Sequence, residues 1–156
     1  MNLSHSATSV PNVRSVCADA RDLSKFGDKS FDLGFSNSLL EHVGAFEDQR
    51  RTASEIRRVC RGYFVQTPNF YFPIEPHFLF FPGWQFLPTG VRTDLLKRRG
   101  FGWMPRAEDE SAARATVESI RLLRSRDMRT LFPDAELVRE KVAGLTKSFI
   151  AIRQAA

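Results

Sequence analysis

The sequence predicts an α/β fold in which parallel strands are followed by an antiparallel C-terminal hairpin. A strand-like segment over residues 31–36 precedes a helical pattern over 45–60 and a second strand-like segment over 63–67. Strand, helix and strand in this order are typical of a parallel pair. Residues 137–143 and 148–153 then alternate like strands around a short turn, and strands so close in the chain pair antiparallel. We therefore expect one α/β domain from the 156 residues.

The first half of the chain supplies further local signals. Residues 13–18 are short and rich in β formers, which predicts a strand ahead of the turn-forming residues 27–30. In the helical segment, acidic residues occupy the first turn, where the helix dipole favours them. Gly62 is expected to end this helix, because glycine is common just past a helix C-terminus.

The second half predicts three shorter helices before the hairpin. They cover residues 92–99, closed by Gly100, and residues 111–123 and 126–131. Ser125 is a suitable N-cap for the last of them, because its hydroxyl can accept a hydrogen bond from a free backbone N–H.

Composition limits the protein class. The 42% hydrophobic and 26% charged residues are ordinary for a globular protein, and no apolar run reaches the roughly 20 residues that cross a bilayer. The N-terminus does not read as a signal peptide, and Cys17 and Cys60 predict buried thiols of a cytoplasmic protein. The net charge of +5 comes from basic residues at helical spacing. A solvated helix face explains this charge best. Nucleic acid is not expected as a partner, whereas binding to a membrane surface, without crossing the membrane, stays an alternative.

Polar groups follow three of the predicted strands. These are Asp19 with Ala20, Ser36 with Asn37 and Ser38, and the segment 67–69. Each alone is explained as a turn former. Because ligands bind beyond the carboxyl ends of strands in an open parallel sheet, the three together favour a binding site at one rim.

Three short stretches carry a family resemblance. Ala18-Asp19-Ala20, together with Ser30-Phe31-Asp32 and Leu40-Glu41-His42-Val43, resembles the class I S-adenosylmethionine-dependent methyltransferases of type 11. The resemblance implies a Rossmann-like methyltransferase sheet, S-adenosylmethionine as cofactor and, in the complete form of the protein, transfer of its methyl group to an acceptor.

The resemblance also implies cofactor-binding residues. Asp19 would accept a hydrogen bond from the adenine amino group, and the backbone N–H of Ala20 would reach a ring nitrogen. Arg21 would continue the family's pattern of residues around the edge of the adenine. The methionine part would lie beside Ser36, Asn37 and Ser38, which end the next strand.

The family's glycine-rich cofactor loop is not found ahead of residues 13–18. We therefore expect residues 1–156 to be a single partial domain that is N-terminally truncated, with an incomplete sheet. In it, residues 13–18 are expected to close up against the strand at 31–36. The alternative function is a non-catalytic remnant that binds a partner or a membrane surface.

Residues 69–93 form an aromatic-rich segment interrupted by prolines, which predicts neither a helix nor a central strand. In the family this position holds the variable substrate cover, so the resemblance implies a small, apolar or aromatic acceptor. A membrane-interface patch and a local core that packs on the sheet are the other interpretations. The candidate substrate-binding residues are Glu41, His42, Asn69, Tyr71, His77 and Trp84.

Glu41 and His42 are also the candidates for proton transfer and for metal binding. His42 is the catalytic candidate, because the pKa of histidine lies near neutral pH, and a residue that only lines the pocket is the alternative. Some family members hold a metal with Glu-His and an earlier acid, but Ser38 stands at that position here. One carboxylate and one imidazole are too few ligands, so no metal is expected.

Overall fold

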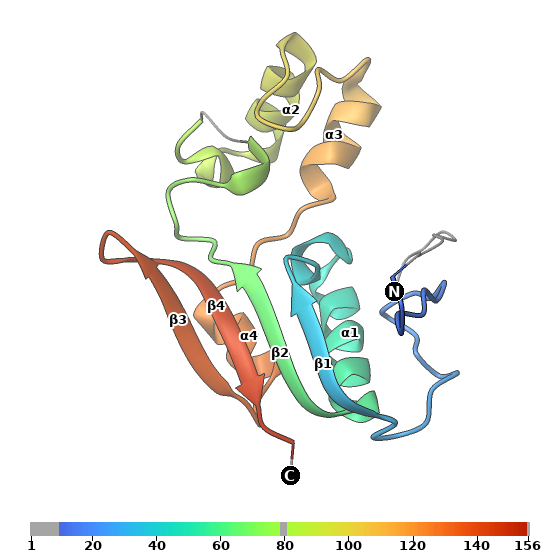
Figure 1. The fold of residues 1–156 in the computed structure, drawn as a ribbon. Coiled ribbons are helices and arrows are strands. Elements are labelled where there is room, and N and C mark those ends of the chain that lie inside the picture. Colours follow the sequence, from blue (N-terminus) through green and yellow to red (C-terminus); the bar gives the residue numbers. More distant parts are fainter. Residues whose placement is uncertain (1–9, 79–80, 156) are drawn as a thin grey trace.

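A computed structural model describes residues 10–78 and 81–155 of the chain. Its four strands form one sheet in the order β1 (Phe31–Asn37), β2 (Cys60–Pro68), β4 (Leu145–Arg153) and β3 (Glu136–Val142) (Figure 1). β1 and β2 are parallel, whereas β4 runs antiparallel to both of its neighbours. The predicted α/β class, with parallel strands followed by an antiparallel hairpin, is confirmed.

Helix α1 (Phe46–Val59) connects β1 to β2 and matches the predicted helical segment. It packs with α4 (Ser125–Leu131) behind the sheet (Figure 1). The shared core includes Ala53 of α1, Val65 of β2, Met128 of α4 and Phe149 of β4, all buried. Burial of these apolar side chains is what holds the two helices on one face of the sheet.

A second core lies beyond the carboxyl end of β2, in the upper part of Figure 1. It is built from the short 3₁₀ turns η2 (Pro76–Phe78) and η3 (Trp84–Phe86) and the helices α2 (Thr89–Arg98) and α3 (Glu110–Glu118). Phe78 and Trp84 stack with their ring centroids 4.3 Å apart. The aromatic-rich segment therefore carries its own core. One of its aromatic residues, Phe80, lies outside the described residues. No helix in the described part of the chain is long and apolar enough to cross a membrane.

Residues 13–18 do not form the strand that was predicted. Only Cys17 makes an isolated bridge there, and the segment does not close up against β1, which is an edge strand of the sheet. Leu33 and Phe35 of β1 are 65% and 72% exposed. A run of β-forming residues does not become a strand without a neighbouring ladder. The loop that follows this segment is held by side chains of α1, described below.

Several predicted boundaries were wrong by one or more residues. α1 ends at Val59, and Gly62 lies inside β2, where an added Cβ would come 2.7 Å from the backbone nitrogen of Ala155. The N-cap of α4 is Arg124 rather than Ser125, and its backbone N–H donates to the carboxylate of Asp127 at 3.1 Å. α3 is shorter than predicted. The close backbone approach at Gly62 is a tertiary feature that local patterns do not carry, whereas the cap at Arg124 comes from Asp127 in the first turn of α4 and is local.

Candidate functional site

The carboxyl ends of β1 and β2 lie at the same rim, as the parallel pairing requires. Ser38, just past β1, donates its backbone N–H to the carbonyl of Gln66 and its hydroxyl to the side chain of Gln66, both at 3.1 Å. Ser38 has a positive φ of 50°, so the chain turns sharply here. This turn leads directly into η1 (Leu40–His42).

A cavity of about 810 Å³ runs along β1 at this rim. Of the residues predicted to bind the cofactor, Asp19, Ala20, Arg21 and Ser36 line it. Asn37 and Ser38 are not among its lining residues. The sequence did not single out the apolar part of the wall, which includes Leu33, Phe35, Leu39, Val43, Ile56 and Val65. A largely apolar cavity with a few polar groups is the usual form of a small-molecule site.

Asp19 is held by Arg21 at the mouth of this cavity. Its carboxylate accepts from the backbone N–H of Arg21 at 2.9 Å and from the guanidinium at 2.6 Å, and Arg21 also reaches Asp48 at 3.5 Å. The hydrogen bonds from Arg21 lower the pKa of Asp19. Any adenine bound here would share the Asp19 carboxylate with Arg21.

The loop that carries Asp19 is fastened to α1 by an ion pair. Glu55 accepts the backbone N–H of Leu23 at 2.7 Å, and Arg58 donates to the carbonyl oxygens of Leu23 and Phe26. Glu55 and Arg58 also bind each other at 2.8 Å. These contacts place the loop over the wall of the cavity although it belongs to no strand.

Ser36 contributes an unsatisfied polar atom to the cavity wall. Its hydroxyl oxygen is buried and has no hydrogen-bond partner among the described residues. Buried polar groups in native proteins are nearly always paired, so an orphan on a cavity wall marks a position where a ligand or water can bind.

Glu41 is fully buried next to the same rim. One carboxylate oxygen accepts from the hydroxyl of Thr67 at 3.0 Å, while the other has no partner among the described residues. Burial raises the pKa of Glu41, because desolvation disfavours the charged form.

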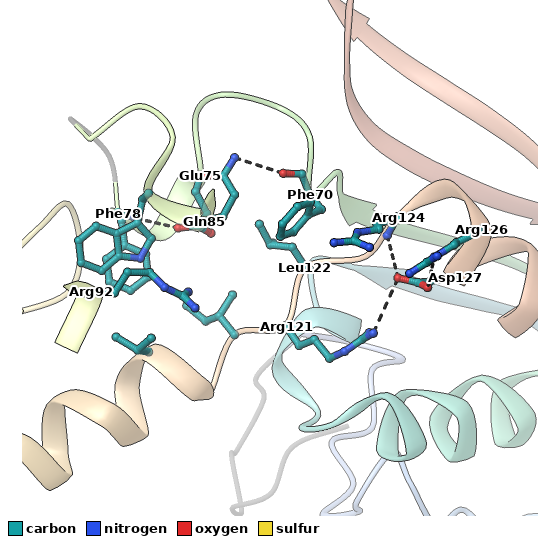
Figure 2. Close-up of a pocket in the computed structure, with 13 residues that line it drawn as sticks. Phe70, Glu75, Phe78, Gln85, Arg92, Arg121, Leu122, Arg124, Arg126 and Asp127 are labelled. Carbon is teal, nitrogen blue, oxygen red and sulfur yellow. Dashed lines mark hydrogen bonds and ion pairs between the residues drawn. The ribbon is translucent and has the colours of Figure 1, made fainter. Parts of the chain in front are cut away.

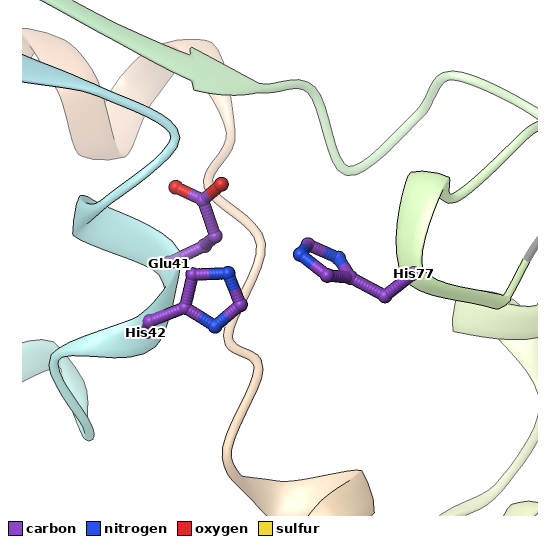
Figure 3. A group of neighbouring side chains, drawn as sticks. All are labelled: Glu41, His42 and His77. Carbon is purple, nitrogen blue, oxygen red and sulfur yellow. The ribbon is translucent and has the colours of Figure 1, made fainter. Parts of the chain in front are cut away.

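The fold brings His77 to Glu41 and His42, as Figure 3 shows. The rings of His42 and His77 stand edge to face with their centroids 4.6 Å apart. His77 Nδ1 lies 2.5 Å from a carboxylate oxygen of Glu75, which raises the pKa of His77. Burial, followed by the neighbouring His77, lowers the pKa of His42. Three residues with ligand-type atoms therefore meet at one point, and sequence spacing did not indicate it.

A second, smaller cavity of about 290 Å³ lies between the aromatic core and α4 (Figure 2). Four arginines line it together with Glu75 and Asp127: Arg92, Arg121, Arg124 and Arg126. Asp127 is paired with Arg121 and Arg126, whereas Nε of Arg92 is buried without a partner among the described residues. Basic residues at helical spacing had been predicted to form a solvated helix face.

The other predicted substrate residues have different surroundings. Asn69 is buried and donates its side-chain amide to the carbonyl of Thr146 at 2.8 Å, so it connects β2 to the C-terminal hairpin. Tyr71 is exposed and lies against the guanidinium of Arg124. Trp84 is 1% exposed and lines the smaller cavity, with its indole nitrogen unpartnered among the described residues.

Comparison with known proteins adds a family match. Residues 2–64 match the family model described as "Methyltransferase domain". Two proteins of Mycobacterium tuberculosis, one from strain CDC 1551 / Oshkosh and one from strain H37Rv, are each 37% identical over 51 residues, and both are described as uncharacterized. That stretch is 33% of this chain and 17% of each relative. The chain thus spans a small part of the curated relatives that it matches.

A solved structure from Methanosarcina mazei, described as a SAM-dependent methyltransferase, is 15% identical with a TM-score of 0.48. The alignment covers 86% of this chain and 63% of that chain. The family match includes Ser36 near the end of β1 and Asp19 in the loop before β1, so the resemblance predicted from those residues is confirmed.

Proposed function

We propose that the cavity along β1 binds S-adenosylmethionine for methyl transfer to a small acceptor, a proposal that the match of residues 2–64 to the methyltransferase family model supports. The observation that carries the proposal is the meeting of Asp19, Ala20, Arg21 and Ser36 on one cavity wall. They come from two segments, and the family resemblance had implied each of them as a cofactor contact. The volume of about 810 Å³ lies in the range of small-molecule sites.

The proposed arrangement places the acceptor on the side of η1 and the aromatic segment. A methyl group moves from the sulfonium in one in-line displacement, so the protein mainly aligns the two reactants and excludes water. Tyr71 of the aromatic segment has an exposed ring, which suits an apolar or aromatic acceptor. His42 lines the cavity wall, and its role in taking up the acceptor's proton stays a prediction.

The cofactor half of the proposal is tested by titrating the isotope-labelled chain with S-adenosylmethionine in NMR. We expect saturable shift changes at the backbone amides of Ala20, Arg21 and Ser36. Asp19→Asn should weaken binding about 2- to 10-fold, the equivalent of one net hydrogen bond of about 0.5–1.5 kcal/mol. Asp32→Asn is the matched control, because Asp32 lies on β1 but is fully exposed and outside the cavity lining. No saturable change, or equal losses in the two variants, would refute the site.

The acceptor half is tested separately with Tyr71→Ala. If Tyr71 contacts the acceptor, transfer of labelled methyl to small phenols should fall while the affinity for S-adenosylmethionine stays unchanged. Trp84→Ala is unsuitable for this purpose, because Trp84 is part of the second core and its loss would unfold that region. A parallel loss of cofactor affinity in Tyr71→Ala would place this segment in the framework rather than at the acceptor.

The non-catalytic alternative has one observation in its favour. Leu33 and Phe35 present apolar side chains on the edge strand β1, and an exposed apolar edge is a typical place for a partner to add. A chain that associates through this edge and shows no shift changes with S-adenosylmethionine would support this function instead.

A further inference from the structure

We propose that Glu41, His42 and His77 form a binding site for one divalent first-row transition-metal ion. One potential ligand atom from each residue lies within 4.8 Å of the other two. Glu41 and His42 come from η1 after β1, and His77 comes from η2 after β2. Two imidazoles and one carboxylate, with further positions open, are a ligand set that zinc, iron, cobalt and manganese use in proteins.

The burial of Glu41 supports the proposal first. Its carboxylate is fully buried, and one oxygen has no hydrogen-bond partner among the described residues. Leaving a buried polar atom unpaired costs free energy, and a bound cation would remove that cost. Thr67 donates to the other oxygen at 3.0 Å and so fixes the carboxylate, as outer-sphere partners do around metal sites.

The orientation of His77 supports it second. Its Nδ1 is bound to the buried carboxylate of Glu75 at 2.5 Å, which leaves Nε2 as the nitrogen available for a ligand. In Figure 3 the far edge of the His77 ring is turned toward Glu41 and His42. Metal-binding histidines commonly donate their second ring nitrogen to a carboxylate in this way.

The distances allow coordination only after the ligand atoms move closer together. Bonds of about 2.0–2.2 Å from a metal at tetrahedral angles place ligand atoms about 3.3–3.6 Å apart. Separations of up to 4.8 Å must therefore shorten by roughly 1.2–1.5 Å, which side-chain rotation can supply. His42 lines the larger cavity and Glu75 the smaller one, so a metal here would lie between the two, open to an oxygen of a small molecule. In the metal-bound protein His42 is a ligand rather than a free base.

The test uses the full chain and Co²⁺ alone, without any methyl donor, so its outcome is independent of the proposed methyl transfer. Calorimetry should show one saturable Co²⁺ site per chain, with a visible absorption band from the coordinated ion. His77→Gln and Glu41→Gln should abolish saturable binding. Glu75→Gln should weaken it about 10- to 100-fold, as expected for an outer-sphere partner. Glu47→Gln, an equal charge change at an exposed position of α1, should leave it unchanged.

A second measurement needs no variant and so does not depend on variants that fold. In the wild-type chain, Zn²⁺ should shift the ring signals of His42 and His77 together at one equivalent. The absence of a saturable Co²⁺ site in the wild-type chain would overturn the proposal. Unchanged binding in a folded His77→Gln variant, or Zn²⁺-dependent shifts confined to His5, would do the same; the three side chains would then be a hydrogen-bonded cluster without an ion.

Discussion

The carboxylate of Glu55 accepts a hydrogen bond of 2.7 Å from the backbone N–H of Leu23, which lies 32 residues earlier in the chain. The same carboxylate pairs with Arg58, which donates to the carbonyl of Leu23. One ion pair on α1 thus satisfies both backbone groups of Leu23. Because the preceding residues Asp19–Arg21 form part of the cavity wall, this contact couples the framework to the candidate site.

Glu55→Gln is expected to destabilise the fold at neutral pH and much less in acid. The hydrogen bond from Arg58 lowers the pKa of Glu55 below its ordinary value near 4.5. A carboxyl whose folded pKa is depressed stabilises the fold above its unfolded pKa, and this contribution is lost as the pH falls through the folded pKa. We expect a loss of about 1–2 kcal/mol at pH 7, typical of a charged hydrogen bond.

Urea unfolding of the wild type and Glu55→Gln at pH 7 and at pH 3 measures this difference. The gap between the two proteins should narrow at pH 3. Glu47→Gln serves as the control, because Glu47 pairs with Arg50 at an exposed position. A gap of equal size at both pH values would show that the effect of the substitution is not electrostatic.

Thr67→Val is expected to destabilise the protein by about 1–3 kcal/mol, since it removes the donor to a buried oxygen of Glu41. Valine nearly matches threonine in shape, so the loss reports the hydrogen bond rather than packing. Thr130→Val, at an exposed position of α4, should change stability by less than about 0.5 kcal/mol. Equal unfolding midpoints for Thr67→Val and wild type would mean that the contact with Glu41 contributes nothing.

Gly62→Ala and Gly90→Ala are expected to act in opposite directions. A Cβ at Gly62 would lie 2.7 Å from the nitrogen of Ala155 and 2.9 Å from the oxygen of Arg153, both backbone atoms, so overpacking should cost about 1–3 kcal/mol. Gly90 lies in α2 with nothing within 4 Å of the added carbon. Its replacement should stabilise the helix by about 0.5–1 kcal/mol. Thermal unfolding of the two variants distinguishes these effects, and a neutral Gly62→Ala would contradict the close approach.

Phe35→Lys is expected to reduce self-association of the chain. Phe35 stacks on Phe64 but is largely exposed on the edge strand β1, where an added strand would find free backbone groups. A lysine at an edge opposes such pairing. Sedimentation at increasing concentration should show more monomer for this variant. Val142→Lys, on the opposite edge strand β3, is the control, and an equal shift in both variants would indicate a general effect of charge.

Much of the fold followed from the sequence by local physics. The period of the apolar residues and the turn formers predicted α1, β1, β2 and the hairpin, because amphipathic spacing is set by which face of an element is buried. The boundaries at Gly62 and Arg124 were missed. The boundary at Gly62 depends on a backbone approach from Ala155, which has no signature in the local sequence. The boundary at Arg124 depends on the capping carboxylate of Asp127, three residues further along the chain.

The candidate site was likewise predicted from the sequence only in part. Predicted strand ends by themselves indicated Asp19, Ala20 and Ser36 as polar groups at one rim, whereas Arg21 entered only through the family resemblance. Only the tertiary structure showed that residues 13–18 do not form a strand and that Arg58 holds Leu23 of the following loop. Only the tertiary structure brought His77 to Glu41 and His42, across 35 residues of chain. Spacing along the sequence determines which side of its own element a residue occupies; which distant residue it meets is decided by how the elements pack.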